Sequence, residues 1–163
     1  MQKNIYHQNK SMKFLKHNLF LLKKLPAAYF CGARMRSLDS TQCEIKITLN
    51  WFNKNPFKSM FWAAQGMAAE LTTGLMMVDK IKKSGYDISM LLISNKANYF
   101  KKATGTIIFN CTQGNKIDDT IEKLIALKTP QIIVLSSTGI NKQNVAVSKF
   151  TFEWSLKIRE KQI

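Results

Sequence analysis

A stretch of nineteen residues, Met60 to Val78, carries a single formal charge, Glu70, near its middle. Lysines follow this stretch, and Gly85 comes just after them, which is typical of the end of a helix. We predict one helix that begins near Ser59, its N-cap, and ends near Lys83, about 36 Å long. Because the helix is apolar on nearly all sides, it has to be covered on nearly all sides. One sheet wrapped around it would provide that cover.

The same stretch has the length of a bilayer span, but its polar residues argue against one. A carboxylate at the centre of a span costs about 2.5–3.5 kcal/mol on insertion scales. Gln65, Thr72 and Thr73 add further polar groups. We therefore predict a buried helix and no membrane span. Three cysteines without a CxxC pair indicate neither a disulfide framework nor a metal site, and they fit a reduced, cytoplasmic setting.

Alternating apolar and polar residues predict strands on both sides of this helix. In QCEIKITLNWF the alternation is strict, from Cys43 to Trp51, which indicates a half-buried strand. Its hairpin partner is predicted in CGARMRSLDST, with a turn near Asp39 and Ser40. Further strands are predicted in DISMLLIS, TGTIIFNCT, QIIVLSST and KFTFEWSLKI. The segment NKIDDTIEKLIALKTP has the spacing of a short surface helix.

The N-terminal region adds one more helix to this order. Residues 1–10 are polar and predicted to be flexible, and residues 11–163 are predicted to form one domain. The amphipathic segment SMKFLKHNLFLLKKL has Ser11 as a candidate cap and Pro26 as its stop. Such a helix lies on a membrane surface or packs on its own domain, and we favour packing. The whole order predicts an α+β fold, with an antiparallel sheet of about six strands around a central helix.

The net charge of +15 comes almost entirely from lysine, because only three arginines are present. This charge implies affinity for anions, such as nucleic acid, anionic lipid or a phosphate-bearing ligand, or else a solvated lysine-rich surface. The lysines are scattered along the chain and lack the fork by which arginine reads bases. We favour the solvated surface and predict no binding of nucleic acid.

This order of elements resembles the hot-dog thioesterase superfamily. The segments NPFKSMFWAAQGMAAEL and FTFEWSLKI, with a helix inserted after the fourth strand, are similar to a branch known only as a domain of unknown function. The resemblance covers roughly residues 25–158. It implies a curved sheet around a helix that carries a catalytic acid, and hydrolysis of acyl-CoA or acyl-carrier-protein thioesters. It also implies a homodimer or dimer of dimers, with coenzyme A present only as part of the substrate and no other cofactor.

The resemblance gives Glu70 the role of nucleophile or of the base that activates water. Burial of this side chain would raise its pKa into the range useful for a base. By the family's spacing, the backbone amide of Trp62 or Ala63 would face the thioester oxygen at the positive end of the helix. Thr73 would orient water or the carboxylate, or would bond back to its own helix. A structural acid, paired with a lysine or bonded across a dimer interface, is the alternative for Glu70.

The loop before the helix supplies the remaining candidates. Asn53 and Asn55 correspond to the family's substrate loop, and Ser59 follows them, although asparagines of this kind also form turns. Many relatives carry His-Gly-Gly at the helix start, where this chain has Phe61, Trp62 and an alanine. Two bulky rings would narrow the substrate entrance or shut it. This departure favours the alternative function, a non-catalytic module that binds an acyl chain or a lipid-like ligand or serves in assembly.

Overall fold

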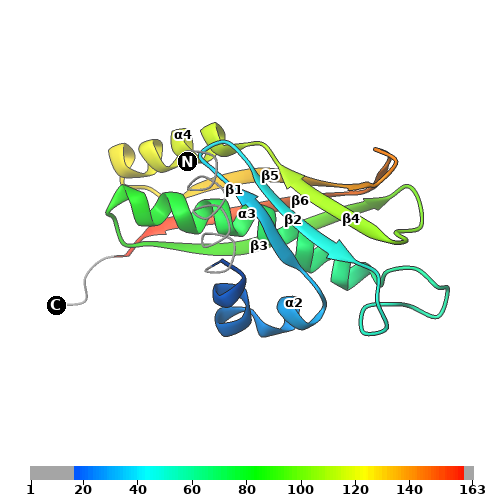
Figure 1. Cartoon of the computed structure of the whole chain (residues 1–163). Helices are drawn as coiled ribbons and strands as arrows, with labels where there is room; N and C mark the ends of the chain where they lie inside the picture. Colours follow the sequence, from blue (N-terminus) through cyan, green and yellow to red (C-terminus); the bar gives the residue numbers. More distant parts are fainter. Residues whose placement is uncertain (1–16, 160–163) are drawn as a thin grey trace, which may run out of the picture.

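The long apolar segment forms helix α3, Trp62–Ser84, and the sheet curves around it (Figure 1). The computed structural model describes residues 17–159, so the stretch 1–10 and the candidate cap Ser11 lie outside the described residues. The helix ends as predicted, with Gly85 in the left-handed conformation at φ 75°. The prediction that Ser59 is the N-cap is wrong, because its hydroxyl pairs with Asn55 in the preceding loop.

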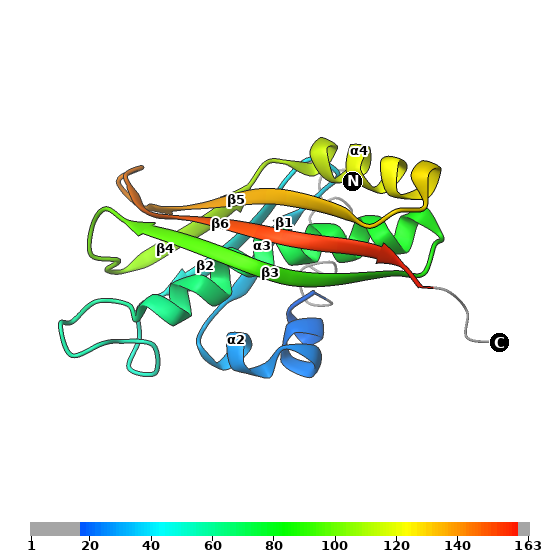
Figure 2. The ribbon, with the colours of Figure 1, turned by 180° about the vertical axis from the view of Figure 1, so that it is seen from behind.

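Within residues 17–159 the strands form one antiparallel six-stranded sheet, in the order β1-β2-β4-β5-β6-β3 (Figure 2). The strands are β1 (Arg34–Leu38), β2 (Cys43–Thr48), β3 (Ile88–Tyr99), β4 (Thr106–Cys111), β5 (Gln131–Asn141) and β6 (Ala146–Ile158). Every neighbouring pair is antiparallel, which confirms the predicted α+β fold with its long central helix. The two strands that form the edges, β1 and β3, differ in length, with 5 and 12 residues.

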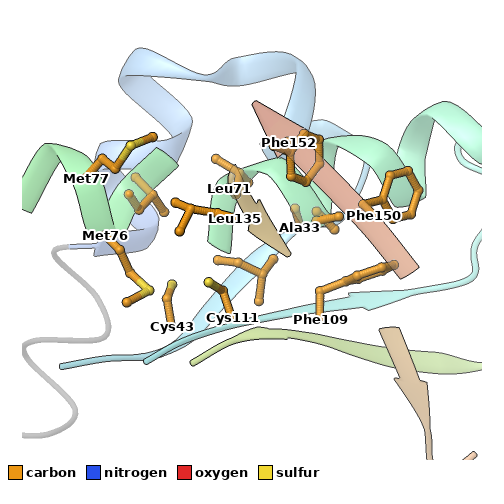
Figure 3. Close-up of a cluster of buried hydrophobic side chains, with 14 of the residues drawn as sticks. Ala33, Cys43, Leu71, Met76, Met77, Phe109, Cys111, Leu135, Phe150 and Phe152 are labelled. Atoms are coloured by element: carbon orange, nitrogen blue, oxygen red, sulfur yellow. The ribbon is translucent and has the colours of Figure 1, made fainter. Parts of the chain in front are cut away.

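The core lies between the concave face of the sheet and α3. Strands β2, β4, β5 and β6 bury alternate side chains against the helix, as the period of two predicts, whereas β3 buries only Ile88. On the neighbouring strands β2 and β4, Cys43 lies opposite Cys111 and both are buried. Figure 3 shows Phe109 and Cys111 pointing from their strand toward the helical side chains, which include Leu71 and Met76. The buried face of β6 is formed by Phe150, Phe152, Trp154 and Leu156.

The alternation in QCEIKITLNWF outlasts the strand that it predicts. Strand β2 ends at Thr48, which lies opposite Thr106, the first residue of β4. Beyond this point the chain leaves the sheet, and Trp51 is 79% exposed. The prediction that Trp51 shares the buried face is therefore wrong, because the pairing of β2 with β4 ends at Thr48 while the apolar alternation continues to Trp51.

Within the described residues, three shorter helical segments accompany α3. Residues 17–24 are helical, and Pro26 starts a second helix, α2 (Pro26–Phe30), at the position where its missing N–H costs nothing. The predicted surface helix is α4 (Gly114–Leu127), and its Ile117 and Leu124 are buried. No helix within residues 17–159 is long and apolar enough to cross a membrane.

Candidate active site

Glu70 lies halfway along α3, on the part of the helix surface that the sheet does not fully cover. Its side chain is half-buried and reaches toward Gly74, one turn further along the helix. A Cβ at Gly74 would stand 2.7 Å from Oε1 of Glu70 and 3.7 Å from Cη2 of Trp154. The Glu70 carboxylate thus lies over Gly74, and the indole ring of Trp154 lies close to the same glycine.

No partner compensates the charge of this carboxylate within the described part of the chain. Residues 17–159 provide neither a hydrogen bond nor an ion pair to the Glu70 side chain. Burial raises the pKa of Glu70 from 4.5 to about 7, as the sequence led us to expect. A carboxyl group with such a pKa exchanges a proton near neutral pH, which is what a general base requires.

The amides predicted to polarise a thioester lie at the start of the same helix. Phe61 holds the N-cap position, so the N–H groups of Trp62 and Ala63 have no acceptor within the helix. Glu70 follows these two amides by seven and eight positions, which corresponds to about 10 to 12 Å along the axis. The side chain of Glu70 also reaches away from them, toward Gly74. One chain therefore does not bring the acid and the amides together.

A cavity of about 570 Å³ lies at this N-terminal end of α3. The predicted residues Asn55, Ser59 and Trp62 line it, whereas Glu70 and the other predicted residues do not. Its walls also include aromatic and basic residues, namely Phe57, Phe61, Tyr99, Phe100, Lys101 and Lys102. The two bulky rings at the helix start therefore form walls of an open cavity and do not close it.

Two of the other predicted residues bond to backbone carbonyls of the chain. The side-chain amide of Asn53 is buried and donates to the carbonyls of Cys31 and Thr48. The Thr73 hydroxyl donates to the backbone carbonyl of Glu70, at 3.0 Å, and not to its carboxylate. For both residues these hydrogen bonds match the structural role, a turn for Asn53 and a bond back to its own helix for Thr73. The functional roles of the two residues stay predictions.

Sequence reasoning missed the surroundings of the acid. Gly74 follows Glu70 by four residues, and that spacing alone places it on the same helix face. No sequence spacing indicates that Trp154 lies near this glycine, because β6 is distant from α3 in the sequence and the two meet only in the folded chain. The indole N–H of Trp154 is buried and has no hydrogen-bond partner among the described residues. Nor does any group of three His, Cys, Asp or Glu side chains within residues 17–159 have the arrangement to hold a metal ion.

A curved antiparallel sheet around one long helix is the arrangement of the hot-dog fold, and comparison with solved structures confirms it. A protein of unknown function from Chlorobaculum tepidum TLS superposes with a TM-score of 0.77 at 16% identity, over 91% of this chain and 96% of that one. A Pseudomonas aeruginosa protein described as a probable thioesterase has a TM-score of 0.76 at 15% identity, over 89% and 96% of the two chains. A thioesterase from Haemophilus influenzae gives 0.64 at 14% identity, over 90% and 94%.

The sequence also assigns the chain to a family. Residues 18–156 match the family described as "Domain of unknown function (DUF4442)", and the chain belongs to it. No curated protein matches this sequence. At such low identities, the solved structures establish a thioesterase-like fold.

Proposed function

We propose that this protein hydrolyses acyl thioesters of coenzyme A or of acyl-carrier protein, with Glu70 as general base or nucleophile. The observation that carries the proposal is the half-buried, unpaired carboxylate of Glu70, with its pKa raised to about 7. The resemblance to the hot-dog thioesterases implies that an acid at this place on the central helix is the catalytic one. The three cysteines are free thiols, and a reducing, cytoplasmic location fits them.

As a base, Glu70 would take a proton from a water molecule while the water oxygen attacks the thioester carbonyl carbon. The carbonyl oxygen then carries the developing negative charge, which unpaired helix amides are suited to stabilise. The carbon–sulfur bond breaks next, and the leaving thiolate takes a proton, so the products are a carboxylic acid and a thiol. As a nucleophile, Glu70 would form a mixed anhydride that water then hydrolyses. Neither route needs a cofactor beyond the coenzyme A of the substrate.

We further propose that the site is assembled by two copies of the chain. A carbonyl group has to lie within about 3 Å of both the acid and the amide, and the same helix holds them much farther apart. The acid of one subunit would therefore act with the helix start of its partner. Strand β3 supports a homodimer, because its outer edge has no strand partner among the described residues and carries the exposed Leu91 and Ile93.

The first test measures thiol release from a panel of acyl-CoA thioesters of different chain length. We expect the wild-type protein to hydrolyse at least one of them, and Glu70→Gln to lower its kcat/KM by about 100-fold or more. Glu122→Gln, on the exposed face of α4, is the matched control and keeps full activity. Equal hydrolysis by Glu70→Gln and the wild type would refute the role of Glu70.

The second test asks whether the site is shared between subunits. Ala63→Pro removes one candidate amide N–H in the first helical turn, where proline is tolerated. We expect it to abolish hydrolysis without unfolding the protein. Refolding an equal mixture of Ala63→Pro and Glu70→Gln chains should then restore about one quarter of the wild-type activity, because half of the dimers contain one intact site. No recovery in verified mixed dimers would refute the shared site.

A non-catalytic acyl-binding function is the second candidate, and the position of the cavity favours it. The cavity lies at the start of α3, its walls include Phe61 and Trp62, and Glu70 does not line it. Calorimetry with a nonhydrolysable acyl-CoA analogue separates the two functions. Tight binding that Glu70→Gln leaves unchanged, combined with no turnover of any thioester, would establish the binding function and exclude the hydrolase.

A further inference from the structure

Aromatic side chains gather at the end of the molecule where α3 begins, and we call this surface the aromatic end. Within the described residues it consists of Trp51, Phe52, Phe57, Phe61, Trp62, Tyr99 and Phe100, all exposed. Phe57 is 73% exposed and Phe52 61%. Figures 1 and 2 show the loop 49–61, the segment after β3 and the β5–β6 turn together at this end, with the loop extending beyond the strands. So large an apolar cluster indicates a binding surface.

The loop holds its rings outward because its interior is occupied by asparagine side chains. Asn53 is buried, and its Nδ2 donates to the carbonyls of Cys31 and Thr48 at 2.8 and 3.0 Å. The Oδ1 of Asn55 accepts from the N–H of Phe57 at 3.0 Å. Polar groups thus fill the inside of the loop and aromatic rings its outside, which reverses the usual arrangement in water. The rings cannot turn inward unless these hydrogen bonds break.

The charges among these rings are all positive. The lysines at this end are Lys54, Lys58, Lys101, Lys102 and Lys142, all exposed and without an ion pair in the described part of the chain. The sequence has no acidic residue between Glu44 and Glu70, and none between Asp87 and Asp118. The aromatic end is therefore complementary in charge to an anionic surface.

We propose that the aromatic end docks onto an anionic lipid bilayer. Tryptophan and tyrosine favour the headgroup level of a membrane, because their rings have an apolar body and one polar group. Phenylalanine is common on the apolar face that interfacial segments bury in the bilayer. Lysine stems lie along the apolar surface while their ammonium groups reach the lipid phosphates. This inference goes beyond thioester hydrolysis. The aromatic end shares Phe61 and Trp62 with the cavity at the helix start, whereas Trp51 and Phe52 lie outside that cavity.

The chemistry of this end favours a bilayer over nucleic acid or protein. Single-stranded nucleic acid binds in basic grooves and also stacks on arginine, and protein hot spots are rich in Trp, Tyr and Arg. The charges here are all lysine, and four of the seven rings are phenylalanine. Lysine is a point charge without directional pairing, which suits a diffuse layer of headgroups. Trp51 and Phe52, on the projecting loop, do not line the cavity.

The test is co-sedimentation of the full chain with vesicles of phosphatidylcholine, alone or with about 30% phosphatidylglycerol. We expect binding to the anionic vesicles and little to the neutral ones. The double substitution Trp51→Ser with Phe52→Ser leaves the net charge unchanged and should weaken binding about tenfold or more. Its matched control, Leu127→Ser with Ile132→Ser, removes two comparably exposed apolar side chains, 62% and 61%, on α4 and β5, and should bind like the wild type.

A second pair of variants tests the charge. Lys101→Glu with Lys102→Glu should abolish vesicle binding, whereas Lys82→Glu with Lys123→Glu, which changes the net charge equally on exposed parts of α3 and α4, should only reduce it. An equal loss of vesicle binding in both double variants would mean that the net charge of the protein, and not the aromatic end, determines binding. That result would overturn the proposal. Unchanged binding after loss of Trp51 and Phe52 would also overturn it. So would a change in oligomeric state, or RNA binding at physiological salt, without any vesicle binding.

Discussion

The two ends of α3 treat their polar groups in opposite ways. We call the C-terminal half of α3 together with α4 the paired end. There a buried Lys80 pairs with Asp118, and an exposed Lys83 pairs with the half-buried Asp79. At the aromatic end the buried polar side chains, which include Asn53, Ser59 and Gln65, are uncharged, and the lysines stand exposed without ion pairs among the described residues. One end of α3 is therefore anchored by ion pairs within its own chain. Its other end presents apolar and positive groups that are suited to contact a ligand or a surface.

The strongest test of the paired end is at Gly114, where α4 begins against the β1–β2 turn. A Cβ at this position would stand 2.1 Å from the Ser40 carbonyl oxygen and 2.6 Å from Cα of Thr41. Because these are backbone atoms, the turn or the helix has to move as a whole. We expect Gly114→Ala to lower the free energy of unfolding by about 3 kcal/mol or more, measured by urea denaturation.

Gly66 in α3 is the matched control. A Cβ there meets Cε1 of Phe150 at 3.6 Å, an ordinary contact. Because alanine has the higher helix propensity, we expect Gly66→Ala to leave stability unchanged or to raise it by up to about 1 kcal/mol. Similar losses in both variants would mean that the contact of α4 with the turn is not what anchors this end.

At the aromatic end we expect asparagine, and not the rings, to maintain the structure. Asn53→Ala removes a buried side chain that bonds three backbone groups, from Cys31, Thr48 and Asn50. We expect a loss of about 2 to 3 kcal/mol in the free energy of unfolding. Trp51→Ala, two residues earlier, should change it by less than about 0.5 kcal/mol. A larger loss for Trp51→Ala would place its ring in the core and remove it from the docking surface.

The sequence predicts the fold well where local pattern and tertiary pairing agree. Strand β6 is one example, because its apolar alternation and its pairing with β3 and β5 cover the same residues. Helix α3 is another, because it ends at the glycine that predicts its end. The prediction for Trp51 fails because the apolar alternation continues beyond Thr48, where the pairing with β4 stops. Ser59 fails because a polar residue before an apolar run signals either a cap or a turn, and here the bonds to Asn55 favour the turn.

The candidate site is less predictable, because its surroundings come from distant parts of the chain. A lone charge in an apolar helix identifies Glu70 and predicts its raised pKa. The sequence contains no sign that Trp154 lies beside it, or that residues 99–103 form one wall of the cavity. Nor does an asparagine in a loop reveal whether its amide meets a substrate or its own backbone, and Asn53 meets its own backbone.

Glu70, between the two ends of α3, makes the free energy of unfolding depend on pH. Its pKa is raised in the folded chain, from 4.5 to about 7, so its protonated form stabilises the fold. This contribution is complete below about pH 4.5 and is lost as the pH rises through about 7. Glu70→Gln should therefore be more stable than the wild type by about 1 to 3 kcal/mol above about pH 8, with little difference at about pH 4. Urea denaturation of both proteins across this range measures the difference.

The smallest effect concerns the exposed pair of the paired end. Nζ of Lys83 lies 2.6 Å from Oδ2 of Asp79, one turn earlier on the solvent side of α3. Water and salt screen such a pair, so a double-mutant cycle with alanine should give a coupling energy of about 0.3 to 0.5 kcal/mol that disappears at high salt. The buried Lys80 differs, because removing Asp118 leaves its ammonium group without a partner away from water. A coupling energy above about 1 kcal/mol that persists at high salt would show that a surface ion pair also anchors this end. The paired end would then differ from the aromatic end in its surface charges as well as in its buried ones.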